Sequence, residues 1–140
     1  VECVPSLDRK VRDHRASFAQ SIDILKEAKR LRPDILTKSS IMVGVGETDA
    51  EITETMQLLR DAGVDLLTIG QYLAPSPKHL PIDRFPEPEV FSQWDQEARL
   101  MGFKAVACGP LVRSSYRGGL LYEEARNGGK SVTYGDCETL

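Results

Sequence analysis

The residues ILTKSSIMVGVGETDAE, numbered 35 to 51, contain the pattern that decides the fold. We predict a strand over Ile35–Val43, which is most apolar at its C-terminal end, and a turn over residues 44–47. Thr48 and Glu51 have the spacing of a capping box, in which each side chain bonds the other residue's backbone amide, so a helix is predicted to begin there. A strand that leads directly into a capped helix is one unit of an α/β fold.

The same alternation of strand and helix continues on both sides of this unit. A helix is predicted over Ala16–Leu31, because its apolar residues recur at helical spacing, and Pro33 ends it. The helix that begins at Thr48 is predicted to end at Ala62-Gly63. The other predicted segments are the end of a strand at Val1–Val4, a charged loop at 8–15, a buried strand at Val64–Ile69, a proline-rich loop at Gln71–Pro88, a helix at Glu89–Leu100 and a strand at Phe103–Cys108.

Successive strand–helix units indicate a parallel sheet with right-handed crossovers. The units suit half of a barrel better than a finished domain, because a parallel sheet must be covered on both faces. The predicted fold class is therefore α/β, the second half of a partial TIM-type barrel. Residues 1–112 would form the later βα units, and residues 113–140 an irregular C-terminal tail, expected to be disordered after about residue 127.

Composition excludes several classes of protein. The 140 residues are 41% hydrophobic and 28% charged with a net charge of −3, which is ordinary for a globular protein. No basic stripe indicates nucleic-acid binding, and no apolar run approaches the roughly 18 residues that span a bilayer. The chain opens without methionine and with a strand already under way, which indicates a fragment or a processed chain. Its three scattered cysteines fit a reducing compartment and form no CxxC or CxxxCxxC motif, so no self-sufficient metal or iron–sulfur motif is present.

Several stretches resemble the lipoyl synthase family, and they occur in the order that is found there. The segment Arg113-Ser114-Ser115-Tyr116 after Gly109-Pro110 is close to diagnostic, whereas a Gly-x-Gly-Glu turn alone would be weak. The stretches are Val11-Arg12 with Arg15, residues 37–48, Gly70-Gln71-Tyr72-Leu73, Pro75-Ser76, His79-Leu80-Pro81 and residues 109–117. Together they cover the chain from Val1 to about Tyr116.

The resemblance implies a radical S-adenosylmethionine barrel of six βα units, of which this chain would supply the later ones. The implied enzyme inserts sulfur at C6 and C8 of an octanoyl group on a lipoyl carrier protein or domain. It uses S-adenosylmethionine, two 4Fe–4S clusters and an electron donor such as ferredoxin or flavodoxin. The six cluster cysteines are expected upstream of Val1, so the fragment alone is expected to be inactive and to hold no catalytic residue itself. The implied compartment is the cytoplasm of a bacterium, or the mitochondrion or plastid of a eukaryote.

The resemblance also implies roles for individual residues. Ser115, with Ser114 as the alternative, is the expected ligand of the sulfur-donating auxiliary cluster; otherwise the two serines satisfy backbone groups in a loop. The turn of Gly44, Gly46 and Glu47 would contact the adenine or order the site. Expected contacts to the rest of S-adenosylmethionine are Glu2 to the ribose hydroxyls and Arg12, Arg15 or Lys38 to the carboxylate. Gln71 and Tyr72 begin a loop over the barrel mouth and would line the octanoyl or the adenosine pocket. His79 is interpreted as a structural residue or as one that supports residues of the site without contacting the ligand.

Two other functions stay open at this point. One is another sulfur-inserting radical enzyme of the biotin-synthase kind, against which the Arg-Ser-Ser-Tyr segment argues. The other is a non-catalytic α/β paralogue that has lost its clusters.

Overall fold

The computed structural model describes residues 1–128 as a mixed α/β structure around one small parallel sheet. The strands are hydrogen-bonded in the order β1-β2-β3, which is also their order in the chain. The elements in chain order are a 3₁₀ turn at Pro5–Leu7, α1 Asp8–Val11, α2 Phe18–Leu31, β1 Lys38–Val43, α3 Asp49–Asp61, β2 Leu66–Gln71, α4 Pro88–Met101, β3 Ala105–Gly109 and α5 Gly118–Arg126. The predicted α/β class is confirmed.

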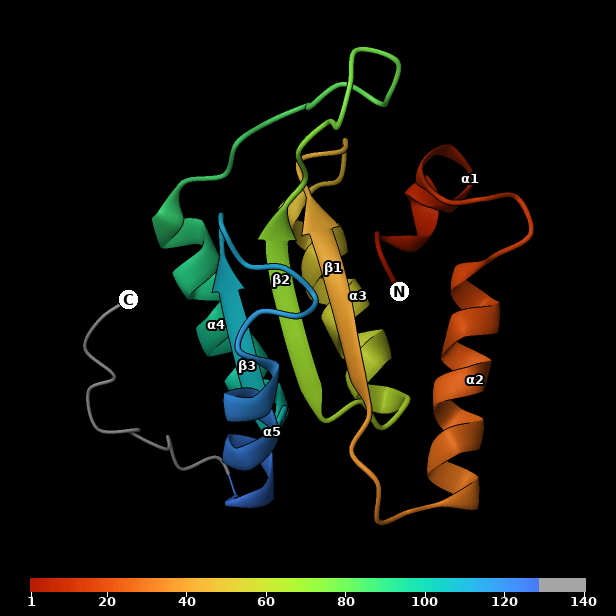
Figure 1. Ribbon diagram of the computed structural model, residues 1–140, viewed down its shortest axis with the longest axis vertical. Helices are drawn as coiled ribbons and strands as arrows, with labels where there is room; N and C mark the ends of the chain where they lie inside the picture. The colour runs from red at the N-terminus through yellow and green to blue at the C-terminus, as the bar shows by residue number, and fades with distance from the viewer. Residues whose placement is uncertain (129–140) are drawn as a thin grey trace.

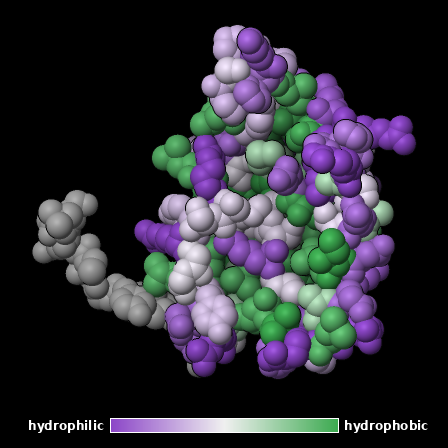
Figure 2. All heavy atoms as spheres, turned by 45° about the vertical axis from the view of Figure 1, so that its right-hand side comes forward, coloured by the Kyte–Doolittle hydropathy of each residue, from purple (hydrophilic) through white to green (hydrophobic). Residues whose placement is uncertain are grey.

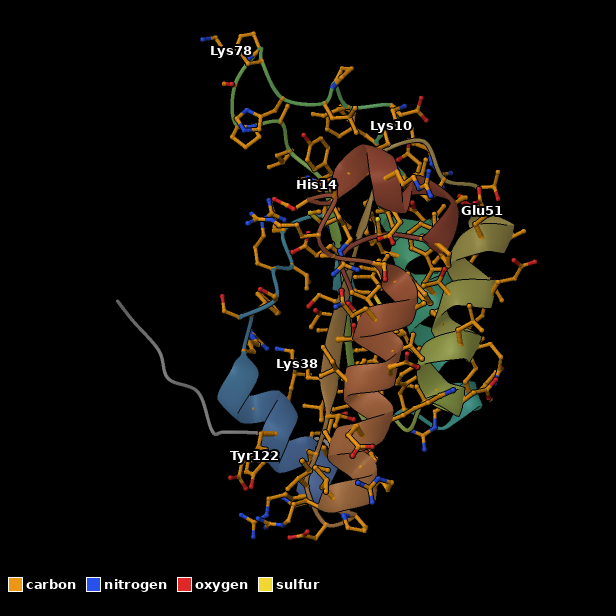
Figure 3. All side chains as sticks on the ribbon, turned by 90° about the vertical axis from the view of Figure 1, so that its right-hand side faces the viewer. Lys10, His14, Lys38, Glu51, Lys78 and Tyr122 are labelled. Carbon is orange, nitrogen blue, oxygen red and sulfur yellow. The ribbon has the colours of Figure 1, made fainter. Side chains whose placement is uncertain are left out.

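The helices cover the two faces of the sheet unequally. Helices α3 and α4, which connect the strands, lie on one face, and α2 lies beside α3 (Figure 1). The opposite face carries α5 and the chain that leads to it from β3 (Figures 1 and 3). We refer to this second face as the inner face and to the helix-covered face as the outer face.

The main core lies between the outer face of the sheet and the helices. Alternation along the strands points Ile41 and Val43 of β1 and Leu67 and Ile69 of β2 toward this core, where all four are almost fully buried. The helices contribute Ile52, Met56, Leu59, Phe91 and Trp94. Every residue of β2 is buried, because a strand lies on each side of it and helices pack against its outer face.

The helix ends follow their sequence signals. Thr48 and Glu51 form the predicted capping box at the start of α3, and Gly63 adopts a positive φ of 85° just after that helix ends. Ser17 caps α2 by accepting a hydrogen bond from the amide of Gln20 at 3.1 Å.

Two expectations about the ends of the chain are wrong. Val1–Val4 does not form a strand: the Met42 amide donates to the Glu2 carbonyl at 2.8 Å, but the Leu7 amide donates to the Val4 carbonyl at 3.1 Å, and Pro5 begins a 3₁₀ turn that leads the chain away. The tail is not irregular throughout, because α5 forms where Leu121 and Ala125 pack on the inner face of the sheet. The predicted disorder after about residue 127 falls almost wholly outside residues 1–128. Within those residues no helix has the length and apolar character to cross a bilayer.

Candidate functional site

A cavity of about 620 Å³ lies on the inner face of the sheet. Three of the residues predicted to contact a cofactor, Glu2, Lys38 and Gln71, all line it. Its other lining residues come from several parts of the chain: Val1, Ser39, Ser40, Ile41, Met42, Thr68, Gly70, Tyr72, Leu73, Pro75, Val112, Arg113 and Ser114. The fold thus brings together the N-terminal residues, two strands, the start of the proline-rich loop and the chain after β3.

The inner face presents hydroxyl groups to this cavity. Thr68 Oγ1 donates to Ser40 Oγ at 2.8 Å, across the register that pairs these residues on β1 and β2. The Ser40 proton meets no protein acceptor within residues 1–128, so it is available to a ligand. Ser39 also belongs to the cavity lining, but alternation along β1 directs its side chain to the outer face with Ile41 and Val43, where its hydroxyl is buried without a partner in that part of the chain.

The sequence interpretation missed Ser40 and Thr68 as site residues. Alternation along β1 places Ser40 on the same face as Lys38, which could have indicated it. Thr68 could not be identified in this way, because its place beside Ser40 depends on the register between the two strands.

Glu47 directs its carboxylate into its own turn and not into the cavity. The side chain is fully buried and accepts hydrogen bonds from the Gly44 amide at 2.7 Å and the Val45 amide at 3.0 Å. Arg84 Nη2 approaches the same carboxylate at 3.4 Å. Glu47 therefore holds the turn between β1 and α3 in shape.

Gly44 allows the proline-rich loop to approach this turn closely. Its φ is +92°, and a Cβ there would lie 2.4 Å from Gln71 Nε2 and 2.5 Å from the Arg84 carbonyl oxygen. Gly46 also has a positive φ, of 121°. Neither glycine belongs to the cavity lining, so the predicted turn stands beside the cavity and contacts the loop.

Hydrogen bonds hold both ends of the proline-rich loop that follows β2. Gln71 Nε2 donates to the Arg84 carbonyl at 3.0 Å, and the Asp83 amide donates to the Gly44 carbonyl at 2.8 Å. Near its start, the Tyr72 hydroxyl donates to the Leu80 carbonyl at 2.8 Å. The side chains of Gln71 and Tyr72 thus hold the loop that borders the cavity.

Arg12 and Arg15 lie outside the cavity lining. Arg12 pairs with Asp8 at 3.4 Å and donates to Ser21 Oγ at 2.9 Å. Arg15 is largely exposed and pairs with Asp13 at 3.0 Å. The structure therefore does not bring these two arginines together with Glu2, Lys38 and Gln71.

The two candidate serines face different surroundings. Ser114 lines the cavity, whereas Ser115 borders a shallow hollow at the start of α5, beside Arg117 and Gly118. Arg113 donates to the carbonyls of Gln71 at 3.2 Å and Val112 at 2.9 Å, so its guanidinium bonds backbone groups.

The cysteines of the described residues do not form a ligand set. Cys3 is fully buried, and burial, with the nearby Asp8 carboxylate, raises the pKa of its thiol to about 11. Burial likewise raises the pKa of the Cys108 thiol, so both thiols are protonated at neutral pH. Within residues 1–128, no three histidine, cysteine, aspartate or glutamate side chains gather as metal ligands. These residues do not fit an iron–sulfur cluster by themselves.

Comparison with known proteins identifies close relatives. The chain is 53% identical to the mitochondrial lipoyl synthase of Xenopus laevis over 119 residues, which are 85% of this chain and 32% of that protein. It is 53% identical to the lipoyl synthase of Thermus thermophilus over 125 residues, 89% of this chain and 39% of the relative. Lipoyl synthase 2 of the Zea mays chloroplast is 52% identical over 122 residues, 87% of this chain and 33% of its own length. No family model matches the chain.

The chain spans about a third of the length of the curated relatives it matches, and the matched part is their C-terminal part. The resemblance that its motifs indicated is confirmed: this chain is homologous to the C-terminal part of the lipoyl synthases.

Proposed function

We propose that this chain acts as the C-terminal part of a lipoyl synthase, a radical S-adenosylmethionine enzyme that inserts two sulfur atoms, at C6 and C8, into an octanoyl group on a lipoyl carrier protein. The observation that carries the proposal is an identity of 52–53% with lipoyl synthases of a bacterium, an animal and a plant, over 85–89% of the chain. The cavity on the inner face, whose mostly apolar wall also carries Glu2, Lys38 and Ser40, supports it.

The proposed fold of the complete enzyme is a partial TIM-type barrel of six βα units. In a barrel, neighbouring strands follow the chain order and the connecting helices lie outside, whereas a doubly wound sheet reverses its order at a switch point. The order β1-β2-β3 with α3 and α4 on one face supports the barrel. Figure 2 shows hydrophobic areas among the hydrophilic ones on the side that carries α2. On this helix Ile24 is 66% and Leu31 62% exposed, which suits a helix that packs against a further βα unit of the complete barrel.

The cavity suits S-adenosylmethionine in size and in chemistry. Its volume of about 620 Å³ lies within the range of small-molecule sites. The Glu2 carboxylate can accept hydrogen bonds from ribose hydroxyls, and the Ser40 hydroxyl can donate a hydrogen bond to the ligand. Of the three basic residues predicted to pair with the carboxylate of S-adenosylmethionine, Lys38 is the one that lines the cavity. When bound, S-adenosylmethionine supplies the 5′-deoxyadenosyl group for radical chemistry. The turn of Gly44, Gly46 and Glu47 would order the edge of the cavity through its contacts with the proline-rich loop. Arg12 and Arg15 would act from outside the cavity wall.

In this proposal the iron–sulfur clusters take their thiolates from parts of the enzyme upstream of this chain. Ser115, or alternatively Ser114, would add one hydroxyl ligand to the auxiliary cluster. An alkoxide is a harder ligand for iron than a thiolate, so it would leave that iron more easily released. The proposed partners are an octanoylated carrier protein and an electron donor such as ferredoxin or flavodoxin. The relatives are bacterial, mitochondrial and chloroplastic, and we propose one of these compartments for this protein.

A chimeric enzyme tests the proposed function. The aligned C-terminal segment of the Thermus thermophilus lipoyl synthase is replaced by residues 1–128 of this chain. After anaerobic reconstitution, the chimera is assayed for 5′-deoxyadenosine and for lipoyl groups on an octanoylated carrier, beside the unaltered enzyme. We expect both products. A correctly folded chimera that forms neither would support a non-catalytic paralogue, and one that cleaves S-adenosylmethionine without lipoyl product would support a different sulfur-inserting enzyme.

Serine variants of the chimera test the ligand assignment. If Ser115 binds the auxiliary cluster, Ser115→Ala removes one bond to one iron while the thiolate ligands remain, so lipoyl formation should fall about 100-fold, as when a metal site loses a supporting contact. Formation of 5′-deoxyadenosine depends on the other cluster and should continue. Ser114→Ala is the matched control and should cost far less. The reverse ranking would assign Ser114 as the ligand, and no effect of either variant would refute the assignment.

A further inference from the structure

The chain between β3 and α5 crosses the inner face of the sheet, over the cavity (Figure 1). Val112 is buried on this path, and its carbonyl packs directly against Gly70 of β2. A Cβ at position 70 would lie 2.0 Å from the Val112 carbonyl oxygen and 3.0 Å from its carbon. Because both of these atoms are backbone, no side-chain rotation could relieve the overlap, and the crossing chain would have to move.

Polar contacts hold the same segment at two distant points of the sheet. Arg113 donates to the carbonyl of Gln71, the last residue of β2, at 3.2 Å. The ammonium of Lys38, the first residue of β1, donates to the carbonyl of Ser114. Since the strands are parallel and paired in register, these two anchors lie at opposite ends of neighbouring strands, and the segment runs diagonally between them.

We propose that Gly70 and Lys38 are positioning residues that fix residues 112–116 across the inner face. Gly70 provides the space for the Val112 carbonyl, and Lys38 holds the carbonyl that precedes Ser115. The importance of this placement for catalysis rests on the proposed function, in which one of the two serines is a cluster ligand. Lys38 thereby has a task besides the expected contact with a carboxylate: it holds the segment that carries the serines at the cavity.

The placement itself is tested on the 140-residue chain by hydrogen exchange. Gly70→Ala should raise the exchange rate of the amides of residues 112–118 by about tenfold or more, because the segment opens locally, while β1 keeps its protection. Gly119→Ala is the matched control, since an added Cβ there meets no atom within 4 Å. Equal exchange of residues 112–118 in Gly70→Ala, Gly119→Ala and the parent chain would overturn the proposal.

A second variant keeps the proposal testable if Gly70→Ala does not fold. Lys38→Met retains most of the length of the side chain and removes its charge, so it should raise exchange at Ser115 and its neighbours, and Lys38→Arg should restore protection. Lys38→Met with unchanged exchange, or Lys38→Arg without rescue, would exclude Lys38 from this role. In the reconstituted chimera, Gly70→Ala should also alter the Mössbauer signal of the auxiliary cluster, and Gly119→Ala should not. Altered exchange with an unchanged Mössbauer signal would leave the placement established and refute its link to the cluster.

Discussion

At the scale of single residues, Asp65 joins the start of the sheet to α2. Its carboxylate is buried, pairs with Lys29 at 2.5 Å and Lys104 at 3.5 Å, and accepts a hydrogen bond from the Thr37 amide at 3.0 Å. Burial alone would raise the pKa of this group, but the hydrogen bonds from Lys29 and Thr37 and the two positive charges outweigh it and hold the pKa below its usual value.

The lowered pKa of Asp65 predicts a pH dependence of stability. A carboxylate with a depressed pKa in the folded state contributes stability that is present above the unfolded value of about 3.9 and is lost as the pH falls through the folded pKa. We expect Asp65→Asn to lower the free energy of unfolding by about 2 kcal/mol near neutral pH and to flatten its decline in acid. Urea titrations of the chain between about pH 7 and pH 3 measure both effects.

The matched control for Asp65 is an exposed aspartate of α2. Asp23 is exposed, so Asp23→Asn should leave the unfolding curve and its pH dependence almost unchanged. An acid-induced loss of stability that is equally steep in Asp65→Asn and Asp23→Asn would show that other carboxylates dominate the titration.

The turn between β1 and α3 was predictable from its own residues, because glycines at 44 and 46 favour a turn and Thr48 caps the helix that follows. The bonds from the Gly44 and Val45 amides to the Glu47 carboxylate were not predicted, although they join residues only two and three positions apart. The contact of this carboxylate with Arg84 was not predictable, since the proline-rich loop returns to the turn through hydrogen bonds that no local pattern encodes.

At the scale of elements, helix ends were predictable and strand starts were not. Pro33, Thr48 and Gly63 act on their own backbone, and the observed helix ends lie close to these signals. The strands begin two or three residues later than predicted. The residues between the predicted and the observed starts of the strands form hydrogen bonds from one strand to the next, since the amides of Asp65 and Leu66 both donate to the Thr37 carbonyl. Helix α5 was missed because its first residues, Gly118-Gly119, favour a loop, and contacts with the sheet stabilise it.

The capping box gives a prediction for α3. Thr48 Oγ1 accepts a hydrogen bond from the Glu51 amide at 3.2 Å, and Glu51 accepts one from the Thr48 amide at 3.1 Å. Thr48→Ala removes the first of these bonds and should lower the free energy of unfolding by about 1 kcal/mol. Thr48→Ser retains the oxygen and should cost much less, as measured by urea denaturation. Equal losses in the two variants would mean that the methyl group, and not the cap, stabilises this helix end.

At the scale of the whole molecule, the cavity is the feature that sequence reasoning could only partly anticipate. Parallel strands bring their C-terminal ends to one edge of a sheet, which accounts for Gln71 at the end of β2. Glu2 also lines the cavity, although residues 1–4 do not form the predicted strand. The path of residues 109–117 back across the inner face places Ser114 in the same cavity. That path depends on Gly70 and Lys38, which are distant from it in sequence.

The distribution of cysteines over the molecule predicts that the chain alone cannot assemble a 4Fe–4S cluster. Even a cluster held by three thiolates needs those cysteines gathered at one place, whereas residues 1–128 contain no such group, and burial keeps the thiols of Cys3 and Cys108 protonated. Anaerobic reconstitution of residues 1–140 with iron and sulfide, followed by gel filtration, should therefore leave far less than one cluster per chain. A variant with all three cysteines changed to alanine provides the background for adventitious iron. Retention of about four iron and four sulfide per chain above that background would show a complete ligand set in this part of the enzyme and would contradict the assignment of the ligands to residues upstream of it.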